Sequence, residues 1–594
     1  GADLTVAGIT ILGKNFLNTN PASVTVFNGL VSAADISNDF GLMTFNNGAN
    51  SRISSDAVLN INGTFNGDLI ALGTVNANNV TLNGILDIAA GTSINITTLM
   101  DVSGLMTMNS ASFTGSGLLN ANAGINISGD STVAGITLNN PAGQTALAGS
   151  NLTLNNGASF INVGTYEING DFGILNSSGV GVFSNIGTLR KSSGAGLSQI
   201  NADLVNTGII DALFGDFSIN GNYTQTGGNI TFNNDTVLDD FQLLSGTLTI
   251  NGKLTITNIF NWAGDSTISG GTLELLSSST MNLAASGGTY NLTSMTLNNS
   301  GAVNYIDGSL LLNNSVINNQ AGGSFNLAAD LLVSGSGSNQ FNNDGILQKI
   351  AGTGTAGFNT TVTFNNRGTV SIDTGLGLID FQGGFAQTTG LTINNAALQA
   401  EDFIINTGTA QGNGTYVGNV VMNGGTMSPG NSIDILTITG DLVLGSNATL
   451  TVEIAGVNAG EFDQVIVQGN VFYDGTLAII DLGNNFSGNV NDNFKPVTSL
   501  TSVGEFASIT PPTGFNFSLL YNAGFLDLTI TQSPRNTQLP DTVPPEFNPS
   551  NDIVSVFNDS VILMDEVSFD SVFIRATEED DREEDEKKVI NLCR

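Results

Sequence analysis

The chain has 594 residues, of which only 11% are charged, and its net charge is −36. Such an acidic chain repels a phosphate backbone, so we expect no nucleic-acid partner. The sequence holds one cysteine, Cys593, and no histidine, which excludes an internal disulfide and an ordinary zinc site of Cys and His ligands. No apolar run approaches the roughly 18 residues that a membrane helix needs, so we expect no transmembrane segment.

Residues 1–411 are predicted to form the repeats of a parallel β-helix. Short segments in which Val, Ile, Leu and Phe alternate with Asn, Ser and Thr are separated by Gly and Asn turns, as in half-buried strands. Separate antiparallel sandwiches are the alternative, but no Pro-rich or Ser-rich linker divides the first 400 residues. We therefore expect an all-β, right-handed parallel β-helix with coils of roughly 20 residues and a length on the order of 120 Å.

One phrase occurs twice, about 160 residues apart. The first copy begins FSNIGTLRK at Phe183, and the second copy begins FNNDGILQK at Phe341. Self-similarity on this scale predicts a stacked architecture in which each unit buries its face against its neighbours. The positions that align the copies are Gly187 with Gly345, Gly208 with Gly368, and Gln225 with Gln387.

The remainder of the chain changes character in four steps. Residues 412–532 have longer strands without the repeat, and we expect them to end the β-helix and form a β-rich cap over its edge. Residues 533–550 contain five of the 11 prolines and predict an extended linker. Residues 551–576 are strand-like, and residues 577–594 form an acidic run typical of a disordered tail.

Two sets of residues resemble bacterial surface proteins, namely filamentous-haemagglutinin-like exoproteins of two-partner secretion and autotransporter passengers. The resemblance covers most of residues 120–530, and the acidic tail ending Val-Ile-Asn-Leu-Cys-Arg is similar to the C-terminus of two-partner exoproteins. The chain starts at Gly1 without an initiator Met, a signal peptide or a recognisable secretion domain, so we expect a processed or partial chain. The matching residues are Gly187, Thr188, Leu189, Lys191, Gly345, Leu347, Lys349, Gly368, Thr369 and Val370, with Gly412–Gly414, Ser428–Ser432 and Phe462–Val465 downstream.

The resemblance implies a secreted protein at the cell surface of a Gram-negative-type bacterium, exported by an outer-membrane secretion partner. Its role would be adhesion or biofilm contact with a host cell, a neighbouring cell or extracellular polysaccharide. The alternative is a self-assembling filament, a homo-oligomer in which residues 551–576 add a strand to a neighbour. A third hypothesis is an enzyme that degrades polysaccharide.

Four residues of the repeats are candidate glycan contacts. Arg190, Lys191 and Lys349 are rare cations at matching positions and suit an anionic glycan, or else they satisfy carbonyls and carboxylates at a corner of the coil. Trp262, the only tryptophan, suits sugar stacking if exposed and core packing if buried. Cys593 is a candidate for anchoring or an intermolecular crosslink, with an idle thiol as the alternative.

Carboxylates are the candidates for catalysis or metal binding. Asp235, Asp239 and Asp240 lie close together, and Glu401 and Asp402 are adjacent. A glycosidase needs two carboxylates on one cleft, about 5–10 Å apart, whereas neighbours on a strand point to opposite faces. We therefore predict solvated turn acids and no enzymatic activity. We expect no cofactor, although a structural calcium ion is compatible with so many acids.

Overall fold

The computed structural model describes residues 4–6, 10–11, 16–18, 23–38, 42–46, 48–430, 432–482 and 486–534. All the described residues belong to one compact unit, residues 1–536. The predicted strand-like segment, the acidic tail and Cys593 lie outside the described residues, as does the linker beyond Pro534. No helix in the described ranges is long and apolar enough to cross a membrane.

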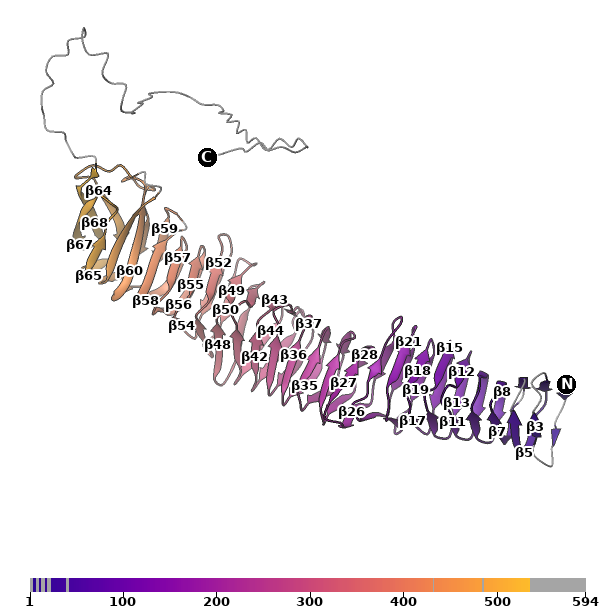
Figure 1. Cartoon of the computed structure of the whole chain (residues 1–594). Helices are drawn as coiled ribbons and strands as arrows, with labels where there is room; N and C mark the ends of the chain where they lie inside the picture. The colour runs from indigo at the N-terminus through magenta and orange to yellow at the C-terminus, as the bar shows by residue number, and fades with distance from the viewer. Residues whose placement is uncertain are drawn as a thin grey trace, which may run out of the picture. The chain divides into compact units, whose positions relative to one another are not determined.

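The predicted all-β parallel β-helix is confirmed: the described chain winds as a parallel β-solenoid of about 21 turns (Figure 1). From β11 (Leu86–Ile88) to β53 (Leu378–Phe381), each strand pairs in parallel with the strand three positions further along. Each turn therefore contributes three short strands, and the solenoid has three rows of strands. Within a strand, inward side chains are buried and outward ones are partly exposed, as the alternating sequence predicts.

The interior of the solenoid is filled by apolar side chains stacked from turn to turn. Trp262 in β37 (Ile259–Trp262) packs against Phe260 of the same strand and against Tyr290 of a following strand. The distances between ring centroids are 5.9 and 5.2 Å. The Phe and Tyr rings of successive turns meet in stacked or edge-on pairs that aromatic side chains favour. This continuous core stabilises every turn through its two neighbours.

Two ladders of buried amides run along corners of the solenoid. In each ladder, the side-chain N–H of one turn donates to the side-chain oxygen of the next turn at 2.6–3.0 Å. Each ladder ends on a glutamine. The first ladder comprises Asn140, Asn162, Asn185, Asn206 and Gln225, and the second comprises Asn299, Asn319, Asn343, Asn366 and Gln387.

The two sequence copies do not stack on the same row of strands. Asn185 ends β25 (Val182–Asn185), whereas its counterpart Asn343 ends β48 (Asn339–Asn343), which is 23 strands later. With three strands per turn, this spacing is two strands more than seven full turns. The row that contains β25 continues instead to β46 (Ser324–Leu327) and β49 (Ile346–Lys349). Equivalent residues of the copies therefore lie on different rows.

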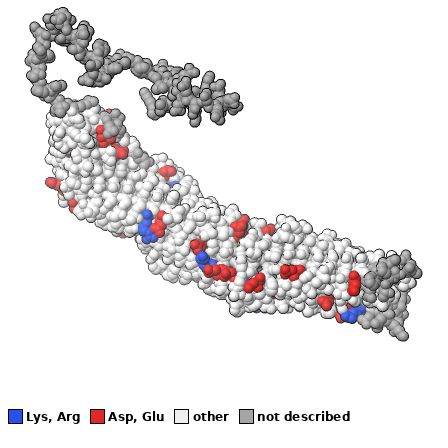
Figure 2. All heavy atoms as spheres, in the orientation of Figure 1, with Lys and Arg blue, Asp and Glu red and all other residues white. Residues whose placement is uncertain are grey.

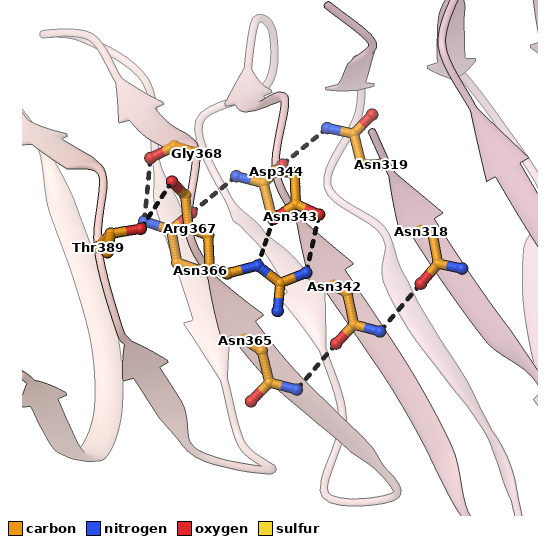
Figure 3. A network of polar contacts seen from close by, with 10 residues as sticks. All are labelled: Asn318, Asn319, Asn342, Asn343, Asp344, Asn365, Asn366, Arg367, Gly368 and Thr389. Carbon is orange, nitrogen blue, oxygen red and sulfur yellow. Dashed lines mark hydrogen bonds and ion pairs between the residues drawn. The ribbon is translucent and has the colours of Figure 1, made fainter. Parts of the chain in front are cut away.

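In Figure 3, one strand of the second copy forms side-chain hydrogen bonds on its inward and on its outward side. Inward, Asn343 accepts from Asn319 at 2.7 Å and donates to Asn366 at 2.8 Å. Outward, the neighbouring Asn342 donates back to Asn318 at 3.0 Å. The inner amides therefore donate toward later turns, and the outer amides donate toward earlier ones.

The C-terminal part lengthens its strands as predicted, but parallel pairing continues well past residue 412. The long strands β58 (Thr415–Pro429) and β60 (Leu442–Ile454) still stack in parallel. Antiparallel pairing enters only where β68 (Phe525–Gln532) joins β64 (Asn493–Thr498) and β67 (Asn516–Asn522). This hairpin therefore extends the sheet from the edge of β64.

The number of turns corrects the predicted length. About 21 turns at about 4.8 Å each give about 100 Å, less than the length predicted from coils of about 20 residues. The difference arises because many turns are longer than that. For example, Val316 pairs with Gln340, 24 residues further along.

We predict that Asn343→Ala destabilises the turns around β48 by at least about 2 kcal/mol. The substitution removes the donor to the buried Oδ1 of Asn366 and one of the two acceptors of the Asn319 amide. Hydrogen exchange of the backbone amides in β48 and its neighbours measures this local loss. Asn342→Ala, on the outer side of the same strand, is the matched control and should cost less than about 1 kcal/mol. Equal losses in the two variants would contradict the importance of the inner ladder.

Candidate functional site

The two repeat lysines are buried and form ion pairs. Lys349 has a fully buried side chain, and its Nζ lies 2.5 Å from Oδ1 of Asp330, whose side chain is 39% exposed. Oδ2 of the same carboxylate accepts the Gly354 N–H at 2.9 Å. The hydrogen bond from Lys349 holds the pKa of Asp330 below its ordinary value. Through these two contacts, Asp330 holds the loop between Lys349 and Gly354 against the end of β49.

Lys191 repeats this arrangement in the first copy. Its side chain is fully buried, and its Nζ lies 3.0 Å from Oδ1 of Asp171 and 2.6 Å from the Gly196 carbonyl oxygen. The Gly196 N–H donates to the same carboxylate at 2.9 Å. Neither lysine reaches solvent, so neither is placed to bind a glycan. Both lysines instead bind carboxylates or carbonyl groups at a corner of the coil, which is the alternative given above.

Of the predicted glycan contacts, only Arg190 lies at the surface. Its side chain is 41% exposed and pairs with Asp211 at 3.3 Å. Trp262 is completely buried, and its Nε1 donates to Ser266 Oγ. An enclosed indole offers no face to a sugar, so the predicted stacking role does not fit Trp262. Arg190 and Lys349 also lie on different rows of strands, which separates the cations that matched in sequence.

The paired acids occupy bends and bulges. Asp239 and Asp240 lie in a bend between β33 (Thr236–Leu238) and β34 (Phe241–Leu243), so strand alternation does not decide where they point. Asp239 accepts from Thr257 at 2.8 Å, and Asp240 accepts from Asn258 at 2.8 Å. Both carboxylates therefore bond to side chains of the following turn.

Asp240 also lines a pocket of about 300 Å³, together with Tyr223, Gln242 and Asn261. It is the single acid among the residues that line this pocket. A glycosidase requires a second carboxylate on the same cleft, which this pocket does not supply. Asp235 is exposed in a separate turn and accepts the Lys253 N–H at 3.0 Å.

The second pair of acids is the repeat counterpart of the first. Glu401 and Asp402 follow Asp239 and Asp240 by 162 residues, the same offset that relates Gln225 to Gln387. They lie in β56 (Ala397–Ile405), where the pairing register shifts between Gln399 and Asp402. Asp402 accepts from Asn419 at 2.9 Å. Within the described ranges, no three Asp, Glu, His or Cys side chains gather closely enough to hold a metal ion.

Asp463 is a buried acid that the sequence offers only as part of the family phrase Phe462–Val465. Its side chain is completely buried, and its two oxygens accept the backbone N–H groups of Asp434 at 2.9 Å and Glu453 at 2.8 Å. Burial raises its pKa to about 7 despite these two hydrogen bonds, and the nearby Asp434 and Glu453 carboxylates add to the rise. The carboxyl group joins the turn before β59 (Ile435–Ile438) to β60.

The surface of the solenoid carries few charges. Figure 2 shows acidic and basic residues as small separate groups on the face in view, surrounded by uncharged atoms. Several of the basic groups pair with a carboxylate of a neighbouring turn, as Arg367 does with Asp344 through contacts of 2.5 and 2.8 Å. The uncharged remainder of the outward positions is largely Asn, Ser and Thr.

The family phrase also contains a sequence signal for the buried ladders. In each copy, an Asn at the end of a strand precedes Gly by two positions, as in Asn185–Gly187 and Asn343–Gly345. The Asn side chain enters the corner, and the Gly allows the next turn to approach closely. At Gly345, for example, a Cβ atom would lie 2.2 Å from the Gly323 carbonyl oxygen.

In the comparisons with known proteins, no family model matches the chain and no curated protein matches it.

We predict that Asp330→Ala lowers the stability of the second copy by about 2 kcal/mol, because it leaves the buried ammonium of Lys349 without its carboxylate. Denaturant unfolding monitored by hydrogen exchange in β49 measures the change. Asp344→Ala removes an exposed ion pair 14 residues further along the chain and should cost less than about 1 kcal/mol. A smaller loss at Asp330 than at Asp344 would show that the buried pair is not stabilising.

Asp463 gives a pH dependence with a defined sign. Since its pKa is higher in the folded chain than in the unfolded chain, the folded state binds more protons between about pH 4 and pH 7. We therefore expect the turns around β60 to become more stable as the pH falls from 8 to 5, and Asp463→Asn to reduce that gain. Hydrogen exchange in β60 at both pH values is the measurement.

The acidic composition also favours the folded chain at lower pH, so a control is needed. Asp441 accepts the Asn470 N–H at 2.7 Å but is not fully buried, and Asp441→Asn should leave the gain in β60 unchanged. If Asp463→Asn keeps the whole gain, the proton is bound elsewhere.

Proposed function

We propose that this protein is an extracellular structural and adhesive solenoid of a bacterial surface. The observation that carries the proposal is the regular, mostly uncharged outer wall, which repeats the same type of side chain from turn to turn. One outward row comprises Asn261, Asn282, Asn304, Asn326 and Gln348, joined by hydrogen bonds of 2.7–2.9 Å.

An amide ladder of this kind suits many weak contacts. Each side-chain amide has two N–H donors and one carbonyl acceptor, so an amide that gives one N–H to its neighbour still has another for a ligand. A row of equivalent sites along one axis binds a repeating polymer by avidity, although each contact is weak. Extracellular polysaccharides and cell-surface glycans are repeating polymers with hydroxyl groups at regular intervals.

The two copies extend this surface around the solenoid. The second copy begins seven full turns and two strands after the first copy, so its equivalent residues lie on a different row of strands. Arg190 in β26 (Thr188–Ser193) and Gln348 in β49 are counterparts of this kind. A solenoid with binding positions on more than one row suits contact with a surrounding matrix or with two partners.

A non-enzymatic role is part of the proposal. Its support is that the pocket at Asp240 is lined by a single carboxylate, whereas a glycosidase needs two on one cleft. Export by an outer-membrane partner and location at the cell surface rest on the sequence resemblance.

The test uses the full chain, coupled to beads at increasing surface density and mixed with bacterial cells, epithelial cells and extracellular polysaccharide. We expect binding that rises steeply with density and single particles about 100 Å long along the solenoid axis in electron micrographs of the unbound protein. Bovine serum albumin coupled at the same density is the control. Absence of binding at every density, with ordered fibres in the micrographs, would favour a filament subunit instead.

A further inference from the structure

A pocket of about 430 Å³ opens on the outer wall of the second copy. It lies on the row of strands formed by β53, β56 and β58, where the pairing aligns Asp380 with Gln399 and Gln399 with Val417. The register shift at Ala400–Glu401 brings Glu401 to the pocket rim. The residues that line it are Asp380, Gln382, Gln399, Ala400, Glu401, Val417, Gly418 and Thr439.

Asp380 is unusual among outward-facing acids because it is only 5% exposed. Its Oδ2 accepts from the Gln382 side chain at 2.8 Å. Its Oδ1 is buried and has no hydrogen-bond partner among the described residues. A buried carboxylate oxygen without a donor is unfavourable, so a ligand that donates to Oδ1 removes this cost in addition to forming a hydrogen bond.

Glycines shape the pocket. Gly357 pairs with Asp380 across the sheet, so the outward position on that side of the carboxylate has no side chain. Gly418 forms the opposite wall, and a Cβ atom there would lie 1.8 Å from the Ala400 carbonyl oxygen. The Gly418 N–H donates to Thr439 Oγ at 3.0 Å, which leaves the Thr439 hydroxyl hydrogen free to bond elsewhere.

The counterpart positions in the first copy carry different side chains. The counterpart of Asp380 is Ser218 and that of Gly357 is Gln199, so a side chain stands where the second copy has a glycine. Ser218 donates its hydroxyl to Asn220 at 2.8 Å. The first copy therefore has no carboxylate at the position that Asp380 occupies in the second copy.

The lining decides the class of ligand. No Lys or Arg lines the pocket, and two carboxylates do, which excludes phosphate, sulfate and uronic acid. The remaining groups are amides and one hydroxyl, which both donate and accept. A metal ion would need several oxygens within about 2.6 Å, and no cluster of three acids exists in the described part of the chain. The volume suits a sugar ring instead.

We propose that this pocket binds an uncharged pyranose unit of a polysaccharide, with neighbouring sugar hydroxyls donating to Asp380 Oδ1 and to Glu401. Hydrogen bonds from hydroxyls to a carboxylate are charge-assisted and short, and Gln399 and Thr439 supply donors for the ring and glycosidic oxygens. This site deepens the proposed adhesive function, on which it rests: it gives one strong contact within a row of weak ones.

The experiment titrates the full chain with neutral methyl pyranosides and neutral oligosaccharides, and separately with calcium chloride, by isothermal calorimetry. We expect millimolar binding of at least one neutral sugar, weakened tenfold or more by Asp380→Asn and by Glu401→Gln. Ser218→Ala, at the counterpart position, should leave the affinity unchanged. Glu401 is exposed, so its variant tests the pocket even if Asp380→Asn disturbs the fold.

Three results would overturn the proposal. They are no binding of any neutral sugar, sugar binding that both pocket variants retain, and binding of calcium alone that Asp380→Asn abolishes. Retained sugar or cell binding in both variants would reject the pocket but leave the adhesive function standing. Conversely, pocket-dependent sugar binding by a chain that adheres to no cell or polysaccharide would confirm the site and reject the adhesive function.

Discussion

The fold depends on how a parallel coil satisfies the polar groups at its corners. The chain must bend three times in every turn. At these corners, the backbone N–H and C=O groups point partly into an apolar interior where no water competes for their hydrogen bonds. In this protein, buried Asn side chains occupy these corners and pass hydrogen bonds from turn to turn. Most of these Asn side chains also donate to a backbone carbonyl of the next turn, as Asn343 does to Thr369 at 2.9 Å. Asn206 and Asn366 donate instead to a carbonyl of their own corner. The ladder therefore fixes both the register of the turns and the path of the chain between strands.

The same constraint explains where the rare cations go. A lysine inside a solenoid is tolerated only if its ammonium is fully paired, and Lys191 and Lys349 each have a carboxylate and a closed loop around them. The surface is left with few basic groups, some of them paired with acids of adjacent turns. The outer wall is consequently polar but carries few charges. Such a wall interacts through hydrogen bonds rather than long-range attraction, which agrees with the proposed contacts to neutral glycans.

The placement of the copies shows how little sequence similarity says about position on a solenoid. Equivalent residues of the two copies lie on different sides of the solenoid, because the spacing between the copies is not a whole number of turns. Each copy preserves the alternation of inward and outward residues, since that depends only on its own strands. Which row of strands a residue joins depends on every insertion before it. The copies also differ in single residues, since Asp380 pairs with Gly357 where its counterpart Ser218 pairs with Gln199.

The sequence by itself determined the class of fold, the alternation of buried and exposed residues and the change of character after residue 412, because these follow from local patterns of apolar residues and turns. It did not determine which polar residues are buried. Trp262 and Lys349 were compatible with either the surface or the core, and the family phrase that contains Asp463 gave no sign that its carboxyl group is buried. Only the tertiary structure decided these cases, because burial depends on which turn stacks above and below, and that depends on the lengths of all the intervening corners.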